Sequence, residues 1–140
     1  MHILIAGALL AALSLPSGAD GGWFTVYGDP AQSERDLIQI RPASIAHLEG
    51  DLISVEVRVT RESPREAYGG GQYRGHQSVV AVDCPRREAW YTRMRFYTQP
   101  GWAGPVEMER SFRQGEAPVK FNAIPDQADR LVRAACRLRR

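Results

Sequence analysis

The sequence has few residues of the types that build most catalytic and metal sites. Only two cysteines, Cys84 and Cys136, and three histidines occur among 140 residues. It contains no CxxC pair, no glycine-rich phosphate loop and no dinucleotide-binding fingerprint. These absences argue against a structural zinc site, a nucleotide-binding protein and a cofactor-dependent enzyme. We therefore expect no metal and no cofactor.

A strong excess of one charge is also lacking. The formal net charge is only +2, and the basic residues are scattered among Asp and Glu along the whole chain. The basic tail Arg137, Arg139 and Arg140 is short and lacks the interleaved aromatic residues of a nucleic-acid site. We expect no nucleic-acid partner.

The N-terminus carries an apolar run, from Ile3 to Leu15. It falls short of the roughly 20 apolar residues that cross a bilayer. Ser17 and Ala19 then occupy the small-residue positions of a signal peptidase site. We interpret residues 1–19 as a cleaved signal peptide and residues 20–140 as the mature domain. An uncleaved anchor is the alternative, and the lack of Lys or Arg before the run is unusual for a signal peptide.

The sequence also indicates where the mature domain is located and how it relates to the membrane. No cysteine follows the cleavage site, so the sequence offers no position for a lipid anchor. No later stretch is apolar enough to cross a membrane. We expect an exported protein, in the periplasm or at the cell surface, that is neither lipid-anchored nor transmembrane.

The two cysteines are expected to form a disulfide. Thiols of exported domains usually pair, and Cys84 ends a predicted strand while Cys136 lies in a predicted helix. The bridge would tie that helix to the sheet and stabilise the fold by roughly 4 kcal/mol on the chain-entropy view. Metal ligation or a catalytic thiol is the alternative, without a CxxC spacing or a nearby histidine to support it.

Alternation of apolar and polar residues predicts an antiparallel sheet. Ile53, Val55, Val57 and Val59 alternate with polar residues, which is typical of a half-buried strand. In the hairpin of residues 78–97, one side of the return strand is expected to carry Trp90, Thr92, Met94 and Phe96. Further strands are expected at 23–27, 37–40 and 106–112, a turn at 42–45, and a flexible loop at 62–75.

The C-terminal segment changes to a helical period. Asp126 is in an N-cap position, and Asp129 favours the positive end of the helix dipole. An apolar stripe at helical spacing follows, formed by Ala128, Leu131, Val132, Ala135 and Cys136. The sequence predicts an α+β domain: one antiparallel sheet of about six strands with a C-terminal helix on one face.

Two loops carry the candidate binding residues. Arg65, Tyr68, Tyr73 and Arg74 flank three consecutive glycines, a mixture of Tyr, Gly and Arg that is typical of binding loops. Trp102 lies between glycines and prolines, where an exposed aromatic side chain would be a frequent interaction hot spot. The alternative for Trp102 is that it folds back over an edge of the sheet.

The candidates for catalysis are weaker. His76 borders the glycine-rich loop, so we expect a solvated loop residue. Ser78 and Asp83 lie five residues apart on one strand and face opposite sides, which prevents a triad with His76. Glu107 and Glu109 share a strand face, as the paired carboxylates of a glycosidase would, but charged residues on a wet sheet face are far commoner. We expect that the protein is not an enzyme.

The order of five segments resembles the bacterial surface-adhesin protein E-like family of exported proteins. The segments are the strand Trp23–Val26, the stretch Ile40–Ile45, the alternating strand Leu52–Val59, the cysteine-ended strand Val80–Cys84 with the aromatic return strand that follows it, and the terminal helix Asp126–Cys136. The resemblance implies an antiparallel sheet with a C-terminal helix held by a disulfide, and binding of host matrix or plasma proteins at the cell envelope. The protein that gives the family its name is lipid-anchored, whereas this sequence has no anchor cysteine.

The leading hypothesis is therefore an exported protein-binding module of the cell envelope that acts as an adhesin. One alternative is a periplasmic inhibitor or accessory factor, which would use the same loops against an enzyme of the envelope. A small envelope hydrolase is the alternative from another functional class.

Overall fold

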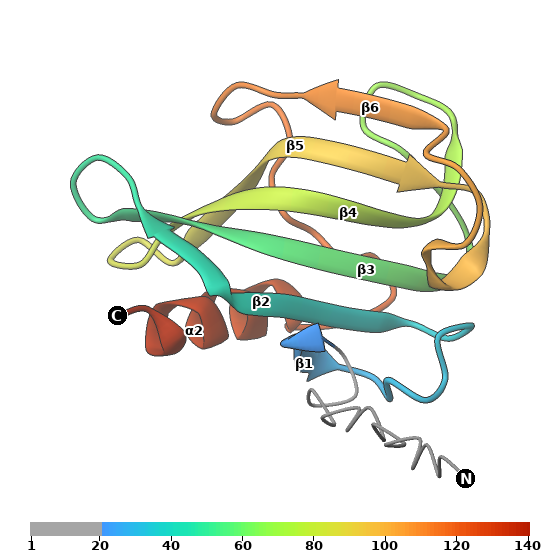
Figure 1. The fold of residues 1–140 in the computed structure, drawn as a ribbon. Coiled ribbons are helices and arrows are strands. Elements are labelled where there is room, and N and C mark those ends of the chain that lie inside the picture. Colours follow the sequence, from blue (N-terminus) through green and yellow to red (C-terminus); the bar gives the residue numbers. More distant parts are fainter. Residues whose placement is uncertain (1–20) are drawn as a thin grey trace, which may run out of the picture.

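The six strands lie side by side in the order in which the chain makes them (Figure 1). The computed structural model describes residues 21–140, so the predicted signal peptide, residues 1–19, lies outside the described residues. The elements are β1 Phe24–Tyr27, β2 Leu37–His47, β3 Leu52–Glu66, β4 Gln72–Asp83, β5 Glu88–Tyr97, the 3-10 turn η1 Pro100–Trp102, β6 Met108–Ser111 and α2 Gln127–Leu138. Every neighbouring pair is antiparallel.

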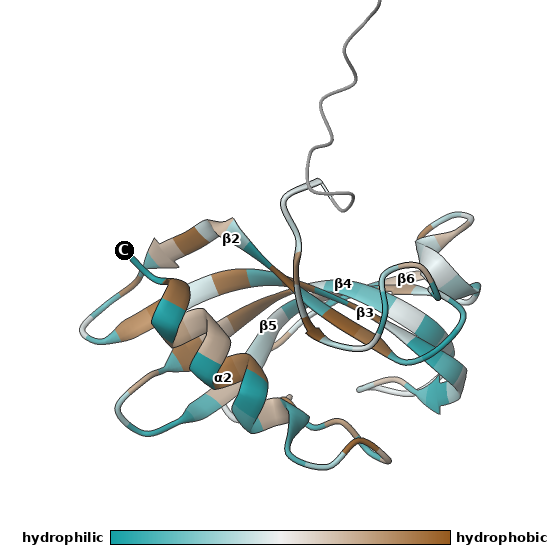
Figure 2. Ribbon diagram, turned by 90° about the horizontal axis from the view of Figure 1, so that it is seen from below, coloured by the Kyte–Doolittle hydropathy of each residue, from teal (hydrophilic) through white to brown (hydrophobic). Residues whose placement is uncertain are grey.

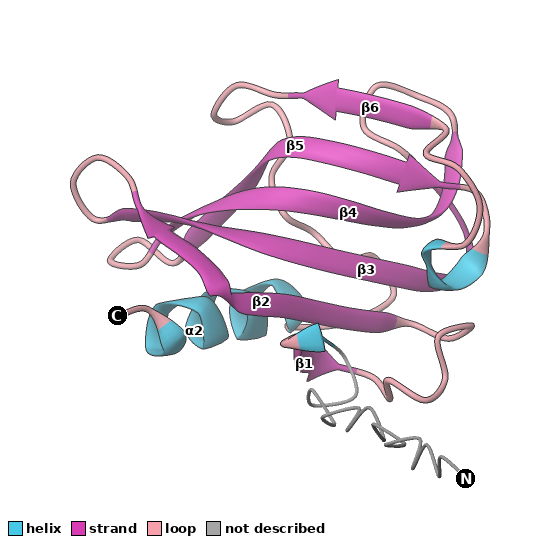
Figure 3. Cartoon of the chain, in the orientation of Figure 1, coloured by secondary structure: helices cyan, strands magenta, loops and turns pink. Residues whose placement is uncertain are grey.

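Helix α2 covers one face of this sheet, as the sequence predicts (Figures 1 and 3). The alternating residues of β3 are buried beneath it, and Val55 stands opposite Val80 of β4. From the helix, Leu131 and Ala135 are fully buried in the same core. Seen from the helix side, apolar residues run along the strands behind α2, and apolar and polar residues alternate along the helix itself (Figure 2). The α+β class, the six-stranded antiparallel sheet and the packed C-terminal helix are all confirmed.

A disulfide fixes the helix to the sheet. The sulfur atoms of Cys84 and Cys136 are bonded, with their Cα atoms 5.9 Å apart, so the predicted pairing is confirmed. The predicted helix start at Asp126 is also correct. Its side chain, however, makes no capping hydrogen bond, because the residue adopts a left-handed backbone conformation with φ of 59°. Asp129 instead pairs with Arg133 one turn further along, at 3.0 Å.

A β-bulge in β5 changes which residues face the core. The pairing of β4 with β5 skips Thr92, so the alternation reverses at that residue. Before the bulge Tyr91 stands opposite Val80, and after it Met94 and Phe96 stand opposite Ser78 and His76 on that same face, whereas Trp90 stands opposite Ala81 on the other face. The expectation that Trp90 and Thr92 share a face with Met94 and Phe96 is therefore wrong.

Strand β2 is longer than its sequence indicates. Residues 42–45, expected to form a turn, lie inside β2, where the pairing with β3 is interrupted between Arg41 and Ala46. Pro42 has no N–H to donate to a neighbouring strand, and such residues are tolerated at irregular positions of a sheet. The turn prediction is wrong because the chain bends there without leaving the strand.

The expected flexible loop at residues 62–75 is instead an extension of a hairpin. Strand β3 runs to Glu66, β4 begins at Gln72, and Arg65 pairs with Tyr73. The turn itself comprises the three glycines 69–71, each with φ between 89° and 96°, a region that other residues rarely adopt. The glycines thus identify the turn correctly, but strand begins right after them at Gln72 and ends only two residues before Tyr68, at Glu66.

Candidate functional site

The tip of the β3–β4 hairpin curls over the same face of the sheet that α2 covers further along. Ala67 is buried there, and the Tyr68 hydroxyl donates a hydrogen bond of 2.6 Å to the carbonyl oxygen of Pro118. Arg110 of β6 donates to the carbonyl oxygens of Tyr68 at 2.5 Å and Gly70 at 2.6 Å. In Figure 1 this turn lies beside β6, at the end of the sheet away from the C-terminus. These hydrogen bonds hold the hairpin tip, residues 65–73, over the sheet, and we call this covering segment the roof.

A pocket of about 390 Å³ lies under this roof, and we call it the hairpin pocket. Three of the five binding residues predicted from the sequence line it: Arg65, Tyr68 and Tyr73. The complete lining is Arg61, Arg65, Glu66, Ala67, Tyr68, Gly69, Gly70, Tyr73, Tyr91, Met94, Phe96, Lys120 and Asn122. The hairpin, strand β5 and the segment before α2 therefore all contribute to one concave site.

Aromatic rings form much of the pocket wall. The rings of Tyr73 and Phe96 lie 5.2 Å apart, and those of Tyr68 and Tyr91 lie 6.3 Å apart. Burial raises the pKa of the Tyr73 hydroxyl, although the nearby guanidinium of Arg61 opposes this shift. Burial also raises the pKa of Tyr91 well above its ordinary value. These hydroxyls consequently stay neutral and can donate hydrogen bonds at physiological pH.

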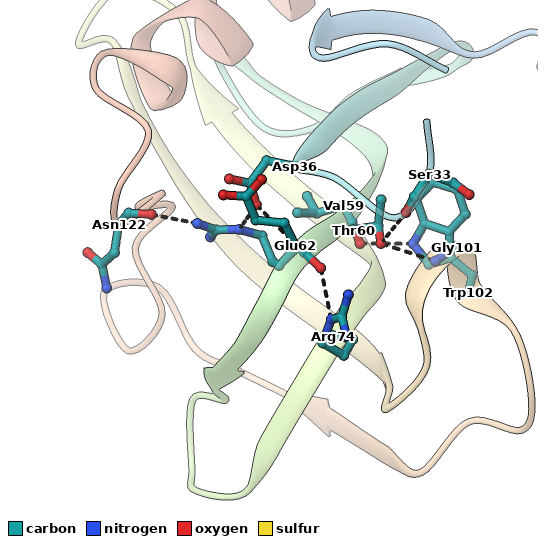
Figure 4. A network of polar contacts seen from close by, with 10 residues as sticks. Ser33, Asp36, Val59, Thr60, Glu62, Arg74, Gly101, Trp102 and Asn122 are labelled. Carbon is teal, nitrogen blue, oxygen red and sulfur yellow. Dashed lines mark hydrogen bonds and ion pairs between the residues drawn. The ribbon is translucent and has the colours of Figure 1, made fainter. Parts of the chain in front are cut away.

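One arginine of the pocket is fully committed to the fold. The Arg61 side chain is almost completely buried, and its Nε pairs with Asp36 at 2.9 Å while Nη2 donates to the Asn122 carbonyl at 2.5 Å. Arg74 lies outside the pocket lining and donates from Nε to the carbonyl oxygen of Arg61 at 2.9 Å. Figure 4 shows Asp36, Asn122 and Arg74 gathered around this point. Arg74 thus contacts the backbone that supports the pocket wall.

Arg65 differs from Arg61 in its partners. Its Nε is buried, and among residues 21–140 no atom accepts a hydrogen bond from it. In the same part of the chain, no carboxylate forms an ion pair with Arg65 or with Lys120 at the pocket rim. The one acidic residue of the lining is Glu66. The pocket therefore contains positive charge that the described chain does not neutralise.

Trp102 is not at an exposed loop tip. Its Nε1 donates to the carbonyl oxygens of Val59 at 2.9 Å and His76 at 3.1 Å, which is visible for Val59 in Figure 4. Its ring stacks on the guanidinium of Arg58, 4.4 Å from the ring centroid, and Trp23 covers the same guanidinium at 4.5 Å. The alternative is correct in that Trp102 folds back onto the sheet, but it lies against the central strands β3 and β4 and not over an edge. Its role in binding stays a prediction.

His76 is buried and not solvated, which corrects the sequence expectation. Since residues 72–83 form β4, His76 lies inside a strand on the core face, where only 1% of its surface is exposed. Its Nδ1 lies 2.7 Å from Ser78 Oγ. Burial, together with the charge of Arg61, lowers the pKa of His76 to about 3. Asp83 lies at the far end of β4, so these three residues do not converge as a triad.

The two glutamates considered for glycoside hydrolysis, Glu107 and Glu109, lie in different surroundings. Glu109 in β6 accepts a hydrogen bond from Arg93 on the exposed face of the sheet, and this bond lowers the pKa of its carboxyl group. Glu107 precedes β6, and its N–H donates to Phe96. A glycosidase acid needs a raised pKa, and the environment of Glu109 acts in the opposite direction.

Comparison of the chain with family models, with curated proteins and with solved structures gave no match. Within residues 21–140, no group of three or more His, Cys, Asp or Glu side chains is arranged to hold a metal ion. In the same residues no helix has the length and apolar character needed to cross a membrane. The resemblance to the protein E-like family therefore stays a prediction from the sequence.

Several pocket residues were missed by the sequence analysis, although a signal for them exists. The alternation of β3 continues from Val59 to Arg61, two residues further on, which places the Arg61 side chain on the core face. An arginine that takes the next inward-facing position of a buried apolar strand is expected to carry its charge into the interior of the domain. Lys120, by contrast, lies in irregular chain, and no periodicity could have placed it here.

Proposed function

We propose that this chain is an exported, non-catalytic protein-binding module of the cell envelope, and that the hairpin pocket receives a segment of the partner. The observation that carries this proposal is the convergence of Arg65, Tyr68 and Tyr73 on one pocket. Its volume of about 390 Å³ lies within the range of ligand sites in proteins. Tyr and Arg are also the residues that dominate interaction hot spots.

The titration behaviour around the pocket supports binding over catalysis. A general acid or base works best with a pKa near the operating pH. The pKa of His76 is lowered to about 3, and the pKa values of Tyr68, Tyr73 and Tyr91 are all raised. None of these groups is poised to exchange a proton at neutral pH, while all three hydroxyls remain hydrogen-bond donors.

Adhesion to host matrix or plasma proteins is the specific form of this proposal, and it rests on the family resemblance. The alternative partner is an enzyme of the producing cell's own envelope, which the same pocket would inhibit or assist. The two forms differ in where the protein must be. An adhesin must be labelled by a membrane-impermeant reagent on intact cells, whereas a periplasmic inhibitor need not be.

Affinity capture tests the proposal. The exported chain, purified with its disulfide intact, would be immobilised and exposed in parallel to host matrix extract and to envelope extract. The double variant Arg65→Gln/Lys120→Gln alters the pocket, and Arg86→Gln removes a charge remote from it as the matched control. We expect a protein that is retained by the unmodified chain and by Arg86→Gln but lost with the double variant. Equal retention by all three proteins, or no retained protein from either extract, would contradict the proposal.

A further inference from the structure

The charges of the hairpin pocket select for an anionic ligand. Its lining contains three cations, Arg61, Arg65 and Lys120, and one anion, Glu66. Asp36 already neutralises Arg61. Within residues 21–140 neither Arg65 nor Lys120 has a carboxylate partner. An acidic group that enters the pocket would therefore meet one guanidinium and one ammonium whose charges are available.

The geometry of Arg65 favours a carboxylate. Its guanidinium presents parallel N–H groups that match the two oxygens of a carboxylate. The Nε–H of this side chain is buried without an acceptor in the part of the chain that the structure describes. An atom so completely buried is out of reach of a ligand in the pocket, so a carboxylate would be bound by the terminal N–H groups of the guanidinium. With Glu66 also in the lining, the pocket suits a single negative charge better than a doubly charged phosphate.

The rest of the wall is suited to a flat ring. Tyr68, Tyr73, Tyr91 and Phe96 surround the cavity with ring spacings between 5.2 and 6.3 Å, typical of offset and edge-to-face contacts. Met94 adds a thioether, which also packs well on aromatic rings. A ligand ring in this space would extend an aromatic cluster that the fold already contains.

We propose that the hairpin pocket binds an aromatic carboxylate, with the carboxylate on Arg65 and Lys120 and the ring against Tyr68 and Phe96. This inference rests on the proposed function, because it names the chemistry that the same pocket recognises. Two sources carry this chemistry. One is the C-terminal aromatic residue of a partner protein, and the other is a free arylalkanoic acid.

Calorimetric titration of the exported, disulfide-intact chain tests the inference with defined probes. The probes are the peptide acetyl-Gly-Gly-Phe with a free C-terminal carboxylate, the same peptide with a C-terminal amide, and 3-phenylpropionate. We expect the free acid to bind about tenfold more tightly than the amide, the difference expected for a charge-assisted hydrogen bond. Tighter binding of the peptide acid than of phenylpropionate identifies a protein C-terminus as the source, and the reverse order identifies a free acid.

Variants locate the carboxylate. Arg65→Gln and Lys120→Gln should each weaken binding of the peptide acid by about tenfold, while Arg86→Gln should leave it unchanged. Lys120 is exposed at the rim, so its variant stays informative even if Arg65→Gln perturbs the hairpin. Equal affinity for the acid and the amide, or no binding of any of the three probes, would overturn the inference.

The outcomes separate this inference from the proposed function. A captured protein that depends on the pocket, combined with equal affinity for acid and amide peptides, removes the carboxylate inference and leaves the binding module. Tight binding of phenylpropionate without any captured protein keeps the carboxylate site and removes the protein-binding function.

Discussion

The two ends of the covered sheet face are closed in different ways. At one end, α2 packs apolar residues such as Leu131 against the strands, and a disulfide holds it there. At the other end, the hairpin covers a hollow lined by tyrosines and arginines, including an Arg65 Nε without a partner in the described chain. The first end is built for stability. The second retains polar groups that a purely structural core would exclude, which is characteristic of functional sites.

The largest effect should come from breaking the covalent closure. Replacing both Cys84 and Cys136 by Ser opens a loop whose ends are 52 residues apart, which should lower the free energy of unfolding by about 4 kcal/mol. For a domain of this size that corresponds to a melting temperature lower by about 15 °C. Urea unfolding of the variant and the oxidised parent measures the difference, and coincident curves would show that packing alone holds α2.

Acid should weaken the polar end next. Because the folded-state pKa of His76 is lowered to about 3 from an ordinary value of 6.5, the unfolded chain takes up a proton first as the pH falls. The free energy of unfolding should not depend on His76 above pH 6.5. Between pH 6.5 and 3 it should fall by about 1.4 kcal/mol per pH unit, or about 3 kcal/mol by pH 4. His76→Gln removes this titration and keeps a side chain able to hydrogen-bond Ser78. Identical pH profiles for parent and variant would contradict the burial of a neutral imidazole.

Trp102 braces the polar end from the opposite face of the sheet. Trp102→Ala removes two hydrogen bonds and the stack on Arg58, and should destabilise the fold by about 2 kcal/mol. Trp102→Phe keeps a ring over Arg58 and loses only the N–H donor, so we expect about 1 kcal/mol. Thermal unfolding of both variants measures these two losses of stability. An unchanged stability in Trp102→Ala would show that Trp102 is an exposed residue available for binding.

The smallest effect is expected at Arg65, and it sharpens the comparison directly. Arg65→Met keeps the length of the side chain and removes the buried unpaired donor, so stability should stay the same or rise by about 1 kcal/mol. Leu131→Ala at the other end is the matched contrast and should cost about 3 kcal/mol. Similar destabilisation by the two substitutions in denaturant titrations would show that both ends are structural.

The sequence predicted the apolar end of the molecule far better than the polar end. Alternation in β3, the helical stripe and the cysteine pair each report on burial through a simple period, and all three are confirmed. The bulge at Thr92 has no such signature, because one inserted residue reverses the phase of everything that follows. His76 was misplaced for a related reason, since the neighbouring glycines suggested a loop where a strand continues.

The candidate site was predicted only in part. The mixture of Tyr, Gly and Arg pointed to Arg65, Tyr68 and Tyr73, which do share a pocket. The same argument selected Arg74, and the expectation of an exposed loop tip selected Trp102, but both side chains donate hydrogen bonds to backbone carbonyls of the sheet instead. Composition marks a segment as a candidate, whereas the direction of each side chain depends on the register and curl of the hairpin. Those features are set by contacts with Pro118 and Arg110, far along the chain.

The strictly sequential order of the strands has a consequence for the kinetics of folding. Each strand pairs with the one made just before it, so the sheet can grow by adding hairpins, and each step closes only a short loop. The contact between Cys136 and Cys84 joins residues 52 positions apart, so forming it closes a much longer loop than any hairpin of the sheet does. The bridge therefore forms late and contributes little to the rate of folding. Its stabilisation should appear mainly as a slower rate of unfolding, which determines how long the folded domain survives.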